Sequence, residues 1–429
     1  MKRKIGGKAS GLKWLKENRD LGFVVPEFRV IDTSYYDEYA RIQESTRLVS
    51  ALASVCSGSE THAFFNPPQR LEEKCNAIAR HFNGKAISVR SSAVVSEDNE
   101  NISGAGIYDT FFLDAEQITP KNLLEKVLQV YASVNSERAI AYRMENGVKG
   151  EQMAVIVQKV VEGYGYAHGV VKSRLPARAG VIPVSWSDVR GAVVGNLPAK
   201  IHTAYFHATK KMHYGNKCIF MTEDALYEKM YALDSLLVSF IPLLRKRYGR
   251  EFEAEFAFDF EGRRVYLLQI RELTNIQDKQ ISFPKNKRAL FVTNICIGAG
   301  EYVGETRFIE DIYEGWDEPE HYVYIAPILR QSGRIDINYD ELTPKKRAMI
   351  LTHQSNPDAH ALNIANERGL LCICADVVSS KQEACYERLK RAGPYVHIVS
   401  DGLQGKVYQA TQEEAEAFNQ RFAPQMARI

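Results

Sequence analysis

The stretch VRSSAVVSEDNENISGAGIYDTFF (Val89–Phe112) decides how this chain of 429 residues is interpreted. It starts at the end of an alternating segment, Ala86–Arg90, whose pattern predicts a half-buried β-strand. An arginine at a strand end can hold phosphate oxygens in a fork. The glycine-rich segment Ser103-Gly104-Ala105-Gly106 would let backbone N–H groups approach phosphates closely. The stretch therefore suggests phosphate binding, and an ordinary Gly-Ala-Gly turn is the alternative.

A second stretch, FEAEFAFDFEGRRVYLLQIREL (Phe252–Leu273), has the pattern of a β-hairpin. Residues two apart on a strand point to the same face, which groups Glu253 with Glu255 and Gln269 with Arg271. If the two strands pair, two carboxylates, an amide and a guanidinium share one surface. Oxygen ligands of this kind suit Mg²⁺, which usually binds through one or two carboxylates plus substrate phosphates. A solvated sheet face with cross-strand ion pairs is the alternative.

A third candidate is His360. The sequence predicts a helix from about Pro357 to Glu367, with Asn356 as its N-cap and Gly369 just past its end. His360 then lies in the first turn, where the helix dipole and free N–H groups disfavour imidazolium and favour a bound or covalently attached phosphate. A neutral imidazole is the form that can attack phosphorus. An ordinary surface or cap-region histidine is the alternative.

Composition restricts the class of protein. Hydrophobic residues make up 45% and charged residues 25%, close to soluble globular averages, which excludes disordered, collagen-like and coiled-coil chains. A net charge of +2 gives no reason to expect nucleic-acid or membrane-surface binding, so a small molecule or another protein is the expected partner. No run of 18 apolar residues occurs, and the seven scattered cysteines show no ligand spacing. We therefore expect a cytoplasmic, reduced protein.

The chain is expected to form two units separated by a linker. Asn275–Arg288 is polar, contains Pro284, and has the composition of a flexible connection. Apolar residues at helical spacing run from Leu123 to Arg143. Further predicted strands are 152–161, 252–260 and 264–270 before the linker, and 348–351, 370–375, 396–400 and 405–408 after it. The mixture predicts an α+β fold.

Taken together, these segments resemble the dikinase family of pyruvate phosphate dikinase, phosphoenolpyruvate synthase and rifampin phosphotransferase. Those enzymes combine an ATP-grasp nucleotide-binding domain with a swivelling phosphohistidine domain. The match covers most of the chain and is weaker from about Val170 to Tyr248. The matching segments, in the family's order, are GGK (6–8), Val89–Phe112, AIAYR (139–143), QKVV (158–161), Phe252–Leu273, HALNIANERG (360–369) and DGLQGKVY (401–408).

The resemblance implies an ATP-grasp domain over residues 1–274, a linker over 275–288, and a smaller swivelling β/β/α phosphohistidine domain over 289–429. It also implies a role for each matching residue. Lys8 and Arg90 would contact ATP phosphates, Ser103 to Gly106 would cover them, and Gln158 would be a further cofactor-binding residue. Glu255 and Gln269 would hold Mg²⁺. Arg271 would stabilise charge on the transferring phosphoryl group, and His360 would carry that group.

The activity that the resemblance implies is an ATP-dependent phosphotransferase. His360 would be phosphorylated from Mg·ATP with release of AMP, and would pass the phosphoryl group to an unknown acceptor, either a small molecule or a separate protein. Several residues depart from the family pattern, among them Ala359 directly before the histidine and Glu253 where Asp is usual. No acceptor domain is recognisable. A ligase-like enzyme that releases ADP and a non-catalytic nucleotide-binding regulatory partner are the alternatives.

Overall fold

The computed structural model divides the chain into two compact units. The first comprises Met1–Tyr164 with Val265–Arg271, and the second comprises Gly165–Arg264 with Glu272–Ile429. These bounds differ from the predicted domain boundaries at 274 and 289, which stay a prediction. The structure describes residues 5–57, 67–95, 107–145, 147–161, 166–175, 180–195, 201–207, 210–214, 240–273, 276, 281–293, 295–308, 322–326, 346–351, 370–374 and 379–426.

The first unit is built on a four-stranded antiparallel sheet of order β1-β4-β2-β3. Its strands are β1 (Phe28–Ile31), β2 (Ile87–Ala93), β3 (Thr110–Leu113) and β4 (Met153–Lys159). The central strands β2 and β4 are buried on both faces over most of their length. β2 continues three residues beyond the predicted strand because Ser91, Ser92 and Ala93 still pair with β4. Arg90 therefore lies within the strand and not at its end.

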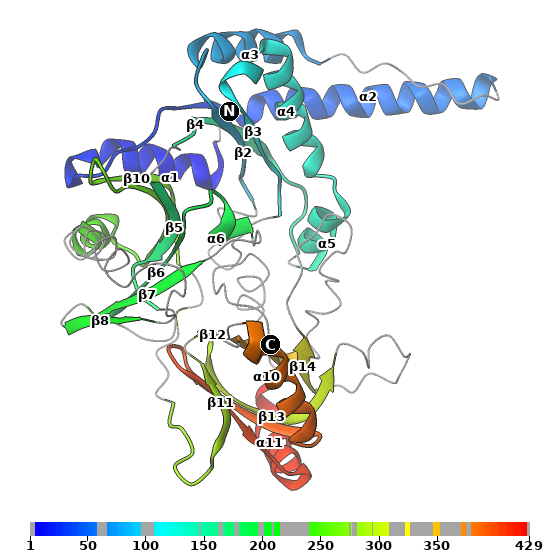
Figure 1. The fold of residues 1–429 in the computed structure, drawn as a ribbon. Helices are drawn as coiled ribbons and strands as arrows, with labels where there is room; N and C mark the ends of the chain where they lie inside the picture. Colours follow the sequence, from blue (N-terminus) through cyan, green and yellow to red (C-terminus); the bar gives the residue numbers. More distant parts are fainter. Residues whose placement is uncertain are drawn as a thin grey trace. The chain divides into compact units, whose positions relative to one another are not determined.

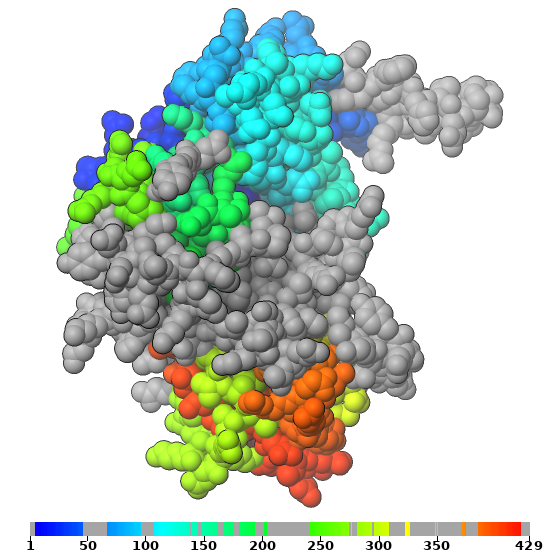
Figure 2. Space-filling view, in the orientation of Figure 1, coloured from blue at the N-terminus to red at the C-terminus, as the bar shows by residue number. Residues whose placement is uncertain are grey.

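Helices cover this sheet, and α3 and α4 pack against each other (Figure 1). In Figure 2 the described atoms of α3 and α4, coloured blue to cyan, form one continuous surface of the first unit. The helices are α1 (Gly6–Glu17), α2 (Thr33–Ser57), α3 (Gln69–His81), α4 (Pro120–Ser133) and α5 (Glu137–Glu145), with the short turns η1 (Arg19–Leu21) and η2 (Ala115–Gln117). Within the described part of the chain, every helix is too short or too polar to span a membrane.

The predicted helical segment 123–143 forms two helices and not one. α4 starts at Pro120, one residue after Thr119, whose side chain accepts a hydrogen bond from the N–H of Asn122. The helix ends at Ser133, and the Ser136 hydroxyl then accepts a hydrogen bond from the N–H of Ala139 at 3.2 Å. Such a serine caps the start of a new helix. The apolar spacing carried no signal of this interruption, because buried apolar residues continue from α4 into α5 at Ala139 and Tyr142.

A six-stranded sheet has the order β10-β9-β5-β6-β7-β8. Its strands are β5 (Tyr166–Lys172), β6 (Val181–Ser187), β7 (His202–His207), β8 (Lys210–Tyr214), β9 (Phe252–Asp259) and β10 (Arg264–Glu272), and α6 (Ala192–Gly195) follows β6. β9 and β10 are neighbours in this order, which confirms the predicted hairpin. At the turn between them, Asp259 accepts a hydrogen bond from the N–H of Gly262 at 2.8 Å.

The second unit also contains an eight-stranded mixed sheet of order β11-β18-β17-β13-β14-β15-β16-β12. Parallel pairs β13–β14, β14–β15 and β15–β16 lie between antiparallel ones. The elements are β11 (Ala289–Thr293), β12 (Ile295–Ile297), β13 (Ala299–Phe308), β14 (Tyr322–Ala326), β15 (Lys346–Leu351), β16 (Leu371–Cys374), α10 (Ser379–Arg391), β17 (Tyr395–Asp401), β18 (Gly405–Gln409) and α11 (Gln412–Met426).

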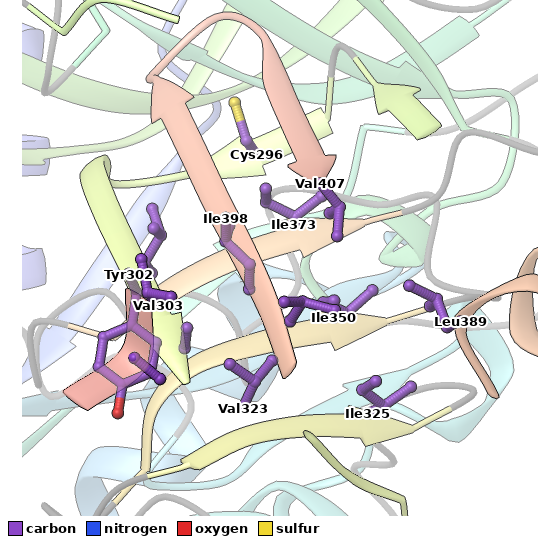
Figure 3. Packing of buried hydrophobic residues seen from close by; sticks show 14 of the residues in the cluster. Cys296, Tyr302, Val303, Val323, Ile325, Ile350, Ile373, Leu389, Ile398 and Val407 are labelled. Atoms are coloured by element: carbon purple, nitrogen blue, oxygen red, sulfur yellow. The ribbon is translucent and has the colours of Figure 1, made fainter. Parts of the chain in front are cut away.

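The core of the eight-stranded sheet joins side chains from both helices and most strands. Val323, Ile350 and Ile398 are fully buried in it, and Leu389 reaches it from α10 (Figure 3). The predicted strands at 348–351, 370–375, 396–400 and 405–408 are all confirmed to within three residues. The predicted helix at 357–367, which carries His360, lies outside the described residues.

Candidate functional site

The N-terminal turn of α1 is attached to β2 through Ser92. The Ser92 hydroxyl accepts a hydrogen bond from the N–H of Ala9 at 3.0 Å and donates one to the carbonyl of Ile5 at 2.8 Å. Next to it, Lys8 donates from Nζ to the Ser91 hydroxyl at 3.3 Å. Both serines are fully buried. The helix that carries Lys8 is therefore fixed to the strand that carries Arg90.

Two glycines allow α1 to lie this close to the strands. Gly6 has a positive φ of 72°, and a Cβ there would lie 2.3 Å from the Ser92 carbonyl oxygen. A Cβ on Gly11 would lie 2.3 Å from the carbonyl oxygen of Ile270, a residue of β10. Real Cβ atoms essentially never approach backbone oxygen so closely. The segment Gly6-Gly7-Lys8 therefore supplies the positive charge of Lys8 and also a glycine that lets α1 approach β2 closely. Figure 1 shows α1 alongside β10.

Arg90 lies among three uncharged oxygen atoms. Its Nη1 donates to Gln158 Oε1 and to the Leu268 carbonyl, each at 3.2 Å. Its Nη2 donates to Gln269 Oε1 at 2.6 Å, a distance typical of a charge-assisted bond. The chain separations are 68 residues for Gln158 and 179 for Gln269. The structure therefore joins Arg90, Gln158 and Gln269, which were predicted from separate motifs.

Gln158 is held in place on both sides of its amide. On β4 it lies opposite Ser88 of β2, so its side chain shares a sheet face with Arg90 two residues further on. Its Oε1 accepts from Arg90, and its Nε2 donates to the Leu268 carbonyl at 3.4 Å. Only 2% of the residue is exposed. Through these contacts Gln158 positions Arg90. The predicted contact of Gln158 with the cofactor stays a prediction.

Gln269 and Arg271 occupy one face of β10, as their spacing predicted. Gln269 is 6% exposed and contributes its amide oxygen to Arg90. Arg271 is half-buried near the end of the strand. Both residues belong to the same compact unit as Lys8 and Arg90.

Glu253 and Glu255 lie on β9 in the second unit. Glu253 is opposite Lys172 of β5, and the two side chains form a largely buried ion pair at 3.6 Å. The cross-strand ion pair that was the alternative for this segment is therefore present for Glu253. Glu255 is opposite Val170 and half-buried. Only Glu255 was assigned to the metal, and that assignment stays a prediction.

The donor chemistry of Glu255 and Gln269 fits Mg²⁺, because both would offer hard oxygen atoms. Among the described residues, no group of three His, Cys, Asp or Glu side chains could hold a metal by itself. Magnesium ions often bind proteins in this way, through one or two carboxylates, with phosphate oxygens and water completing the coordination.

Glu151 is a residue that the sequence analysis missed. Its Oε1 accepts from the N–H groups of Val94 at 3.1 Å and Val95 at 2.8 Å, and its Oε2 accepts from the Tyr108 hydroxyl at 3.1 Å. These residues flank segment 96–106, so one carboxylate ties together the two ends of the predicted phosphate-covering segment. Ser103–Gly106 themselves lie outside the described residues. No pattern in the sequence distinguishes Glu151, since the contacts come from residues more than 40 positions away.

His168 lies on β5, on the same sheet face as Glu253 and Glu255. Burial, and then the positive charge of Arg190, lower the pKa of His168 to about 4, while Asp188 opposes this shift. The imidazole is therefore neutral at pH 7. No motif or spacing in the sequence distinguishes His168 from the other histidines.

In this α+β fold an arginine meets two glutamines from separate strands, beside the strand residue that binds Lys8, which is an arrangement suited to an anionic ligand such as a nucleotide. A model of the family described as "Pyruvate phosphate dikinase, AMP/ATP-binding domain" matches residues 2–289. The chain belongs to this family, which confirms the resemblance found in the sequence.

Curated relatives agree with this family. The phosphoenolpyruvate synthase of Pseudomonas aeruginosa is 24% identical over 347 residues, which cover 71% of this chain and 42% of that protein. The phosphoenolpyruvate synthase of Pyrococcus furiosus is 22% identical over 414 residues, covering 88% and 47%. The rifampicin phosphotransferase of Streptomyces sviceus is 36% identical over 97 residues, covering 22% and 10%. The chain thus spans less than half the length of each of these relatives.

Proposed function

We propose that the protein is an ATP-dependent phosphotransferase that works through a phosphohistidine. The observation that carries the proposal is the convergence of Arg90 with Gln158 and Gln269, beside the strand residue Ser91 to which Lys8 is bonded. This convergence occurs inside the segment that matches the AMP/ATP-binding domain family. The names of the relatives, phosphoenolpyruvate synthase and rifampicin phosphotransferase, support phosphoryl transfer as the class of reaction.

In this proposal the chain's own residues bind and orient the nucleotide. Lys8 and Arg90 hold phosphate oxygens, Arg90 as a planar fork and Lys8 as a point charge. Ser103 to Gly106 cover the phosphates with backbone N–H groups. Arg271 balances negative charge that develops during transfer. Mg²⁺, held by Glu255 and Gln269, would neutralise charge on the phosphate oxygens.

The proposed carrier is His360. Its neutral imidazole attacks the β-phosphate of ATP, the bond between the α- and β-phosphates breaks, and AMP leaves. Transfer of the terminal phosphate to water or to another oxygen acceptor then leaves phospho-His360. That group passes to an acceptor, which is a small molecule or a separate protein. A covalent carrier is useful when the donor and acceptor sites cannot share one pocket, and residues 275–288 would supply the freedom to move.

The test is incubation of the full chain with Mg·ATP, followed by measurement of AMP, ADP and acid-labile, alkali-stable protein phosphate. Wild type should produce AMP and phosphoprotein, and His360→Ala should produce neither. His81→Ala is the matched control, because this partly exposed histidine pairs with Glu27 and should leave both signals unchanged. Identical AMP traces for wild type and His360→Ala would remove His360 from the mechanism.

A second variant tests the phosphate site directly. Arg271→Ala should abolish AMP formation while the circular dichroism spectrum stays that of wild type, and full activity would exclude Arg271 from the reaction. The nucleotide product separates the proposal from its alternatives. ADP without phosphoprotein would indicate a ligase-like enzyme, and tight ATP binding without any product would indicate a regulatory nucleotide-binding protein.

A further inference from the structure

Arg90 is hydrogen-bonded to the one atom of Gln269 that the proposed metal ion would need. A glutamine amide has a single oxygen, which is its only atom able to bind a cation such as Mg²⁺. In this structure that oxygen, Gln269 Oε1, accepts a hydrogen bond from Arg90 Nη2 at 2.6 Å. The guanidinium also donates to Gln158 Oε1 and to the Leu268 carbonyl. The guanidinium thus occupies the position of a cation on Gln269.

A divalent cation could not join Arg90 on this oxygen without a large cost. Mg²⁺ binds oxygen at about 2.0–2.1 Å, so an ion on Gln269 Oε1 would lie only a few ångströms from the guanidinium. Positive charges at that separation repel strongly in a partly buried environment, and Gln269 is only 6% exposed. One of the two cations must therefore give up the oxygen.

We propose that Arg90 competes with the metal ion for Gln269 Oε1, and that nucleotide phosphate ends the competition by drawing the guanidinium away. Phosphate oxygens are charged and match the guanidinium fork, so they bind it more strongly than the uncharged oxygens of Gln158, Gln269 and Leu268 do. The metal then binds together with the nucleotide and not before it. Because coupling between two ligands is reciprocal, the metal also strengthens nucleotide binding by the same factor.

This inference rests on the proposed function, which assigns Arg90 to phosphate and Gln269 to the metal. It gives Gln158 a positioning role in the nucleotide-free protein. With its amide held by both Arg90 and the Leu268 carbonyl, Gln158 keeps the guanidinium directed at Gln269. The pair Arg90 and Gln269 then sets the order in which ligands bind.

The experiment is a Mn²⁺ titration of the nucleotide-free full chain, with free Mn²⁺ followed by electron paramagnetic resonance. Arg90→Met should bind Mn²⁺ roughly tenfold more tightly than wild type, within the usual range of coupling between two sites. Arg90→Gln removes the same charge but keeps a hydrogen-bond donor, and should give the same gain. Arg29→Met is the control, because it removes a positive charge from strand β1 of the same sheet, where Arg29 contacts His81, while Arg90 stays on Gln269. Its Mn²⁺ affinity should stay within about twofold of wild type.

A double variant assigns the gain to the shared oxygen. In a Gln269→Leu background, Arg90→Met should no longer increase Mn²⁺ affinity. Equal Mn²⁺ affinity in wild type and both Arg90 variants would overturn the inference, as would a gain that persists in the Gln269→Leu background or appears equally in Arg29→Met. Circular dichroism of every variant identifies any that do not fold.

Repeating the titration with a non-hydrolysable ATP analogue separates this inference from the proposed function. The analogue should increase Mn²⁺ affinity in wild type far more than in Arg90→Met. If wild type does not bind the analogue, the proposed function fails, whatever the nucleotide-free titrations show. If wild type binds the analogue but the Arg90 variants show no gain without it, the competition alone is wrong.

Discussion

Replacing Ser92 by alanine should release the N-terminal turn of α1 from β2. The Ser92 hydroxyl is fully buried and bridges the N–H of Ala9 and the carbonyl of Ile5. A buried hydrogen bond contributes about 0.5–1.5 kcal/mol net, so loss of both should cost about 1–3 kcal/mol. The cost should fall on α1 itself, because both lost partners are backbone groups at its start.

Amide hydrogen exchange of α1, measured by mass spectrometry, reports this local cost. If α1 opens as a local unit, a loss of about 1–3 kcal/mol speeds exchange roughly five- to 150-fold. Strands β2 and β4 should exchange at nearly wild-type rates in the same sample. We also expect weaker ATP binding, because Lys8 belongs to the turn that is released.

Ser91→Ala is the matched control for this prediction. Ser91 is equally buried on the same strand, but its hydroxyl accepts from the Lys8 side chain at 3.3 Å. Since no backbone group of α1 loses a partner, exchange of α1 should stay within about threefold of wild type. Wild-type exchange in Ser92→Ala, or equal acceleration in both variants, would refute the role of Ser92 as the attachment of α1.

Three further predictions concern other contacts. Gly11→Ala should destabilise the protein by about 1–3 kcal/mol in urea denaturation, because the new Cβ would lie 2.3 Å from the Ile270 carbonyl oxygen. Replacing glycine by alanine inside a helix usually stabilises a protein, and stabilisation here would contradict the close packing of α1 on β10. Glu151→Gln leaves one acceptor oxygen in place of two and should lower the free energy of unfolding by about 1–2 kcal/mol. Amide exchange at Val94 and Tyr108 should become faster, and unchanged exchange there would show that Glu151 does not hold these two residues in place. The pKa of His168 is about 4 in the folded protein and 6.5 in the unfolded chain, so the unfolded chain binds a proton first as the pH falls. Through this residue the free energy of unfolding should therefore decrease by about 2 kcal/mol from pH 7 to pH 5. His168→Gln should remove that part of the pH dependence in urea titrations, and an identical dependence would show that burial of His168 is not its source.

Local patterns in the sequence predicted eight of the eighteen strands found in the described residues. Alternation and β-branched runs located β4, β9 and β15–β18, because a strand's pattern depends on its own residues and the faces that they occupy. The pattern was insufficient where a boundary depended on neighbours. β2 extends to Ala93 because β4 continues beside it, and the predicted helix at 123–143 is interrupted where Ser136 caps a new helix.

The sequence by itself determined the family and the α+β class, and it supplied the residues of the proposed phosphate site, because short motifs such as Arg90-Ser91-Ser92 keep their order along the chain. Only the tertiary structure decided which of these residues meet. Arg90 and Gln269 are 179 positions apart, and they meet because the fold brings β10 within reach of the Arg90 and Gln158 side chains, which no local periodicity specifies. The same holds for the roles of Ser92 and Glu151. Each is an ordinary polar residue in the sequence, and becomes important because the fold brings backbone N–H groups of distant segments within hydrogen-bond reach of its side-chain oxygen.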